Sequence, residues 1–246
     1  MSTPYWTALK VLNQVAGELG LPQQTTVVGL SDLQSVQLLS LLNSGGNELM
    51  LYYPWEQFAK EWLFTTTVNQ ANYDLPADYN YFVDQTQWDR TDHWPLLGPK
   101  SAQEWAWLKN ALVAQLPRLR YRVAGNQLML YPTPQATNSP SSYQLSFEYI
   151  VKNWVQKADT SLTDMIVADG DLLKYNPWLL VKFVKFKYYE LKGFATAGVN
   201  GDFMRVFNSL TGKDTGASIL SLSPKAGSQY LGPWSVPDGS WNVYGV

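Results

Sequence analysis

Two hydrophobic periods divide this chain, and their order constrains its fold more than any single motif does. Apolar residues recur at three- and four-residue spacing up to Tyr53 and again after Asp164, which predicts helices. Between these segments the period shifts toward two, which predicts strands. Because the flanking helices are expected to pack together, the pattern predicts an α+β protein, in which a β-rich domain is inserted into a discontinuous helical bundle.

The expected domain boundaries follow from these shifts. Residues 1–60 and 164–215 form the predicted helical domain, and residues 61–163 form the β-rich insert, which bears one helix. From residue 216 onward the composition changes to two charges, five Gly, three Pro and six Ser. Gly and Pro break any regular pattern there, so residues 216–246 are expected to form an extended C-terminal arm.

The N-terminal segment predicts two helices. Residues 4–20 carry apolar side chains at helical spacing. Ser31 with Gln34 three residues later predicts the capping box of the second helix. That helix is apolar over more than half its circumference, so it should be covered on several sides. Gly45-Gly46 interrupts its pattern, at about 2 kcal/mol relative to Ala.

The remaining elements are predicted from turns, caps and alternation. Ser101 with Glu104 gives a second capping box, and the alternation around Gly125 predicts a β-hairpin. The predicted strands are residues 61–68, 118–123, 127–131 and 143–151. After residue 164, a helix start is expected at 169–175, a kink or restart at Asn176-Pro177, and helices at 178–191 and 201–210.

The composition excludes several classes of protein. Charged residues make up 15%, against about 25% in typical domains, while aromatic residues reach 14%. A surface poor in charge and rich in rings is typical of buried protein contacts. The net charge of −2 argues against a DNA-coating role, and the absence of Cys excludes disulfides. No signal peptide or membrane span is apparent, so a soluble protein made in a cytoplasm is expected.

Four of the eleven Trp and the single His lie in one stretch, residues 75–108. Its segments read LPADY, FVDQTQWDR, PLLGP and SAQEWAWLK, in that order. This order resembles the adaptor, or head-to-tail connector, proteins of short-tailed bacteriophages, and the resemblance extends from about Trp6 to Leu210. Large rings bury much area at small rotamer cost, so Trp88, Trp94 and Trp105 are interpreted as core or interface residues.

The resemblance implies a structural protein of the virion, not an enzyme, with no cofactor. In that family, copies form a ring that docks under the portal at the capsid vertex and receives the tail, and the resemblance implies twelvefold symmetry. The implied partners are further copies of the chain, the portal protein, a nozzle or tube protein of the tail and, non-specifically, DNA in the channel. No membrane is implied, and assembly would take place in the host cytoplasm. The family also implies that the second helix continues to Tyr53.

The arm carries four spaced rings. Tyr230, Trp234, Trp241 and Tyr244 lie among few charges, and a merely disordered tail usually has more charge and no Trp. Rings on an extended segment suit an arm that orders against a partner, here the portal. The alternatives are that the segment folds back on its own protomer or is a disordered leftover.

Two basic patterns suggest contacts. Lys182, Lys185 and Lys192 share one arc of the helix that begins near Trp178, which is consistent with a solvated face, an acidic portal rim or DNA. Arg118, Arg120 and Arg122 alternate along a predicted strand, on an exposed face or against a neighbouring subunit or DNA.

The main enzymatic alternative is a wall-degrading hydrolase of the muramidase type. The acids Asp84, Asp89, Asp92 and Glu104 lie among Trp residues, and glycoside hydrolases pair two carboxylates. A non-catalytic glycan-binding module is the related alternative. Nothing in the sequence fixes two acids across a cleft, His93 is interpreted as a turn residue, and no phosphate-binding loop is present. No catalytic, cofactor or metal residues are therefore assigned.

Overall fold

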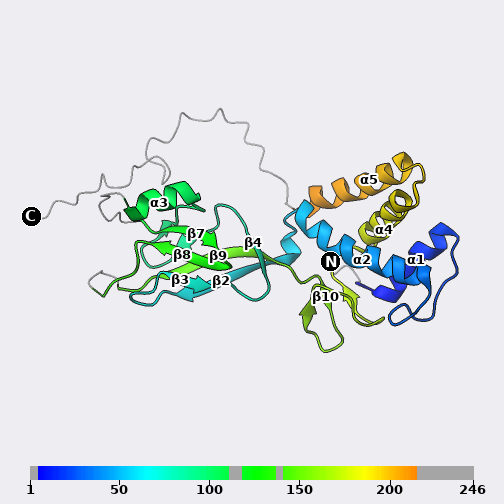
Figure 1. Cartoon of the computed structure of the whole chain (residues 1–246), viewed down its shortest axis with the longest axis horizontal. Coiled ribbons are helices and arrows are strands. Elements are labelled where there is room, and N and C mark those ends of the chain that lie inside the picture. The colour runs from blue at the N-terminus through cyan, green and yellow to red at the C-terminus, as the bar shows by residue number, and fades with distance from the viewer. Residues whose placement is uncertain (1–4, 111–117, 137–140, 215–246) are drawn as a thin grey trace, which may run out of the picture. The chain divides into compact units, whose positions relative to one another are not determined.

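The computed structural model describes residues 5–110, 118–136 and 141–214 (Figure 1). Within these ranges the chain has five α-helices and three antiparallel sheets, so the fold is mixed α+β. It divides into two compact units. One contains the described residues up to 59 and from 150 onward, and the other contains the described residues between 60 and 149.

The first unit is built around helix α4, Pro177–Lys192. It contacts the three other helices of the unit, α1 (Ala8–Leu19), α2 (Leu33–Tyr52) and α5 (Ala197–Asp214). Leu179, Leu180, Phe183 and Val184 of α4 are fully buried. Figure 1 draws α1 and α2 in blue and α4 and α5 in yellow and orange, which shows that distant parts of the sequence meet in this unit.

Helix α2 is continuous through Gly45-Gly46, so the interruption that the residues suggested is wrong. The cause lies in its neighbours. A Cβ at Gly46 would overlap the indole of Trp154, and one at Gly45 would lie 2.9 Å from the ring of Phe183. The Gly pair therefore lets two large buried rings contact the helix backbone, which compensates its low helix propensity.

The predicted cap of α2 and the helix start predicted at 169–175 are wrong. Asp32, not Ser31, caps α2, because its carboxylate accepts a hydrogen bond from the backbone N–H of Ser35 at 3.1 Å. No helix begins at 169–175. There the Asp171 carboxylate accepts the N–H groups of Val167 and Ala168 in a turn that leads into a strand. Helix α4 starts at Pro177, which suits a first helical position because proline lacks an N–H.

A small sheet in this unit was not anticipated. Its strands are β1 (Trp6–Thr7), β12 (Leu172–Leu173), β10 (Val155–Gln156) and β11 (Leu162–Thr163), in that order across the sheet. The helix expected from residue 4 therefore begins only at Ala8, capped by Thr7. Helix α5 is longer than the predicted 201–210, since it begins at Ala197.

The second unit contains two sheets. The strands are β2 (Ala59–Thr65), β3 (Asn72–Asp74), β4 (Tyr79–Phe82), β5 (Trp88–Asp89), β6 (Trp94–Pro95), β7 (Arg120–Ala124), β8 (Gln127–Tyr131) and β9 (Gln144–Val151). Strands β7 and β8 pair antiparallel around Gly125, which confirms the predicted hairpin. The core includes Leu128, Leu145 and Phe147, which are fully buried.

Helix α3, Ala102–Asn110, starts with the predicted capping box. The N–H of Glu104 donates to the Ser101 hydroxyl at 3.2 Å, and the Glu104 carboxylate accepts the Ser101 N–H at 3.1 Å. The sequence prediction is confirmed here because both partners of the cap lie three residues apart.

Candidate interaction surfaces

Helix α2 presents one long face without charge, called here the α2 outer face. At about 100° per residue its members fall within roughly 100° of arc. They are Leu33, Val36, Gln37, Ser40, Ser44, Asn47 and Leu51. Leu33 and Leu51 are 80% and 72% exposed. Helices α1 and α4 and the indole of Trp154 cover the rest of α2, which confirms the expectation of cover on several sides. The outer face stays uncovered in the single chain, and its exposed leucines mark it as a candidate contact surface.

Lys182 and Lys185 do not form a solvent-facing stripe with Lys192. Their ammonium groups both lie against Glu18 of α1, with Nζ to carboxylate distances of 2.9 and 3.0 Å. Burial opposes ionisation of Glu18, but hydrogen bonds and charge from the two lysines outweigh it and hold its pKa below the ordinary value. The two lysines therefore fasten α1 to α4. Lys192 is exposed, and its Nζ lies 5.4 Å from the ring centroid of Tyr188.

We expect Glu18→Gln to lower the free energy of unfolding at pH 7 by about 1 kcal/mol. Because the folded-state pKa of Glu18 lies below its ordinary 4.5, the stabilisation is present above pH 4.5 and is lost as the pH falls through the lowered pKa. Urea unfolding of both proteins between pH 3 and 7 measures this, and the two curves should converge at the acid end. A constant difference at all pH values would contradict the ion-pair explanation.

A matched control is available on α4. Glu190 lies 3.7 Å from Lys187 and is 58% exposed, so the pair is well solvated. Glu190→Gln should change stability by less than about 0.5 kcal/mol at any pH.

The three arginines of the β-rich unit have different environments. Arg118 and Arg120 are buried, at 5% and 6% exposure, whereas Arg122 is half-buried. The Arg118 guanidinium lies 4.6 Å from the ring centroid of Trp94, within cation–π range. The expectation of an exposed strand face is therefore wrong for Arg118 and Arg120. Arg118 precedes the strand, and both side chains are buried.

The three candidate tryptophans also differ. Trp105 is buried on α3 at 4% exposure, and Trp94 is half-buried beneath Arg118. Trp88 is 42% exposed on β5. Of the three, Trp105 is the buried core residue, and Trp88 has the most exposed ring.

Two of the acids among these rings, Asp89 and Glu104, take structural positions. The buried Asp89 carboxylate accepts the N–H groups of Thr91 and Asp92, which closes the turn that contains His93. Burial raises the pKa of Asp89, and the two backbone N–H groups oppose that rise. Arg90 pairs with Glu61 instead of Asp89, and Glu104 caps α3. These hydrogen bonds and this ion pair stabilise local structure within the β-rich unit.

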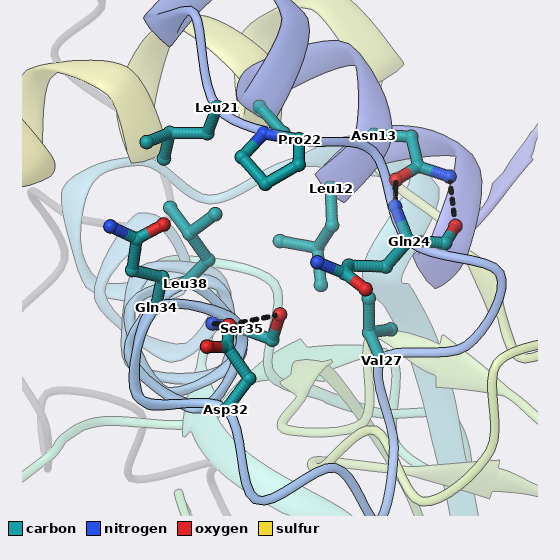
Figure 2. Close-up of a pocket in the computed structure, with 11 residues that line it drawn as sticks. Leu12, Asn13, Leu21, Pro22, Gln24, Val27, Asp32, Gln34, Ser35 and Leu38 are labelled. Atoms are coloured by element: carbon teal, nitrogen blue, oxygen red, sulfur yellow. Dashed lines mark hydrogen bonds between the residues drawn. The ribbon is translucent and has the colours of Figure 1, made fainter.

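A tight crevice separates the end of α1 from the start of α2 (Figure 2). The Asn13 side chain donates to the carbonyl of Gln24 at 2.8 Å and accepts its N–H at 2.9 Å, so the loop after α1 is fastened. Leu12 and Leu38 point into the space, whose volume is about 10 Å³. This holds about one water molecule, so the crevice is a packing feature.

A larger opening lies beside α4 and α5, called here the α4–α5 hollow. Its two adjoining parts have volumes of about 340 and 380 Å³ and share Asn176 and Leu210. Trp55 and Tyr175 line the first part, while Trp178 and Val206 line the second. Trp178 is 47% exposed. The hollow could not be predicted from the sequence, because its walls come from three separate segments of the chain.

Three further expectations concern the C-terminal arm, metal ions and membrane-spanning helices. The arm residues Tyr230, Trp234, Trp241 and Tyr244 lie outside the described residues. Within the described part of the chain, no group of three His, Cys, Asp or Glu side chains is placed to hold a metal ion. In the same part, none of the helices has the length and apolar character needed to cross a bilayer.

The structure is that of a mixed α+β protein. The packing of the single chain does not account for two of its surface features, the α2 outer face and the α4–α5 hollow. A family model described as SU10 adaptor protein matches residues 6–221. The chain therefore belongs to the SU10 adaptor family, a family of phage head-to-tail adaptors, and the resemblance found in the sequence is confirmed. This membership indicates a structural phage protein with a place in the virion. No curated protein matches the chain.

Proposed function

We propose that copies of this chain close into a ring, twelvefold as the resemblance implies, that docks under the portal and joins the capsid to the tail. The family match over residues 6–221 carries this proposal. In this proposal the helices provide the lateral contacts as a bundle of N- and C-terminal segments. The insert, residues 61–163, faces a nozzle or tube protein of the tail, and the arm, residues 216–246, locks the ring to the portal.

The α2 outer face supports the lateral contacts. It is long, uncharged and uncovered, and a ring needs one surface that receives a different surface of the next copy. A 20-residue helix is about 30 Å long, which is enough for a substantial contact. Of the basic candidates, Arg122 and Lys192 are the least enclosed, and we propose these for non-specific contact with DNA in the channel.

Electron microscopy of the purified protein mixed with its portal tests the proposal. We expect closed rings seated coaxially on the portal, with a diameter that reports the number of copies. Protomers that stay solitary beside intact portals would contradict it.

A charge on the α2 outer face should prevent ring closure. We expect Ser40→Glu to reduce the fraction of rings at least ten-fold, because a desolvated charge without a partner opposes association. Ser40→Ala is the matched control and should assemble normally. Since Ser40 is exposed, both proteins should match the parent in unfolding free energy within about 0.5 kcal/mol. Equal assembly of the two variants would exclude this face as the lateral contact.

A further inference from the structure

The α4–α5 hollow has the size and lining of a site for an aromatic side chain. Its parts, of about 340 and 380 Å³, fall within the range of small-molecule pockets. Trp55 and Tyr175 are 3% and 0% exposed, so they form the floor behind the first part. The accessible apolar lining comes from Trp178, which is 47% exposed, from Val206 and from Leu210, which joins the two parts. A ring entering here would gain edge-to-face contacts and area burial at little rotamer cost.

The chain leaves the described structure at the rim of this hollow. Helix α5 ends at Asp214, which lines the hollow together with Lys213. Residues 215–246 follow and carry Tyr230, Trp234, Trp241 and Tyr244. The family match ends at residue 221, so these rings belong to a part of the chain that the family model does not cover.

The length of the chain after the rim favours this segment as the occupant. Trp234 is the first Trp after the rim, and the intervening residues, at about 3.4 Å each when extended, span the hollow several times over. A tether this short gives an effective concentration of about millimolar, well above that of separate copies in dilute solution.

We propose that, before assembly, Trp234 occupies the α4–α5 hollow of its own chain. The hollow then holds the arm against its own helices until a portal pocket binds the same ring more tightly. The consequence for assembly rests on the proposed function, whereas the contact itself does not.

Engineered cysteines test the contact, because the chain contains no Cys. Ser209→Cys places a thiol in the hollow, and Ser235→Cys places one beside Trp234. In the full-length protein at micromolar concentration, we expect this pair to form a disulfide at least ten times faster than the control pair Ser40→Cys with Ser235→Cys. Non-reducing electrophoresis should show the product at the mass of one chain.

A third variant tests whether Trp234 is the side chain that occupies the hollow. Trp234→Ala added to the Ser209→Cys, Ser235→Cys pair should lower its rate to that of the control pair. Equal rates for the two pairs, or a rate that is unchanged by Trp234→Ala, would overturn the proposal. A product with the mass of two chains would also overturn it, since the ring would then come from a second copy. Far-UV circular dichroism verifies that each variant retains its helices.

Docking to portal-bearing capsids is measured separately on the unmodified protein. Fast disulfide formation without docking would reject the adaptor function and leave the hollow contact standing. Normal docking with equal disulfide rates would reject the hollow contact and leave the adaptor function standing.

Discussion

A chain shortened to end at Thr215 is expected to fold normally and to lose binding to portal-bearing capsids by at least a hundredfold. The described helices and sheets all precede this position, so the core stays intact. The removed segment carries four rings, and a ring that anchors an interface commonly contributes 2 kcal/mol or more. Co-sedimentation with portal-bearing capsids measures the loss, and circular dichroism measures the fold.

Full-length protein with Ala at Tyr230, Trp234, Trp241 and Tyr244 separates the rings from the mere length of the arm. It should bind as poorly as the shortened chain. Replacement of all the arm's Ser residues by Ala is the control and should bind normally. If the shortened chain docks like the parent, the arm does not fix the adaptor to the portal.

Gly46→Ala is expected to lower the free energy of unfolding by about 3 kcal/mol. A Cβ there overlaps the indole of Trp154, which is fully buried and donates to the Asn47 side chain at 2.9 Å and to the Asp164 carbonyl at 3.1 Å. The ring cannot move without breaking these bonds. Thermal unfolding followed at 222 nm should show a midpoint lowered by about 10 °C.

Gly201→Ala is the matched control. It adds the same methyl to helix α5, where a Cβ would meet no atom within 4 Å, and should raise stability by up to about 1 kcal/mol. Opposite signs for the two substitutions would establish that packing, not helix propensity, decides the effect at Gly46. If Gly46→Ala is neutral, the indole does not lie on the α2 backbone.

The parts of the fold that the sequence predicted depend on residues close together in the chain. The hairpin around Gly125 and the cap of α3 by Ser101 and Glu104 each need only a few neighbouring residues. The α2 cap was misassigned by one residue, because Ser31 and Asp32 are both good caps and only the backbone geometry selects between them.

Two of the failures have a different cause, because they depend on partners far away in the sequence. Gly45-Gly46 reads as a helix break until Trp154 and Phe183 are placed against it. Lys182 and Lys185 read as a solvated stripe until Glu18 is found between them. The small sheet could not be predicted either, because strands of two residues have no period to detect.

The candidate surfaces were predictable only in part. The low charge of the chain indicated contact surfaces, and the resemblance indicated the family, but neither located the α2 outer face or the α4–α5 hollow. Exposure of Leu33 and Leu51 is a property of packing, and the hydrophobic pattern alone predicted burial for that helix.

The division of the helical unit between both ends of the sequence also affects how the protein is synthesised. Helices α1 and α2 leave the ribosome early, yet α4, against which they pack, is translated only after the β-rich unit. Since domains fold as units when their residues are available, the β-rich unit is expected to mature first. During that interval the apolar faces of α1 and α2 are unburied, so nascent chains at this stage are the ones that should most need a chaperone.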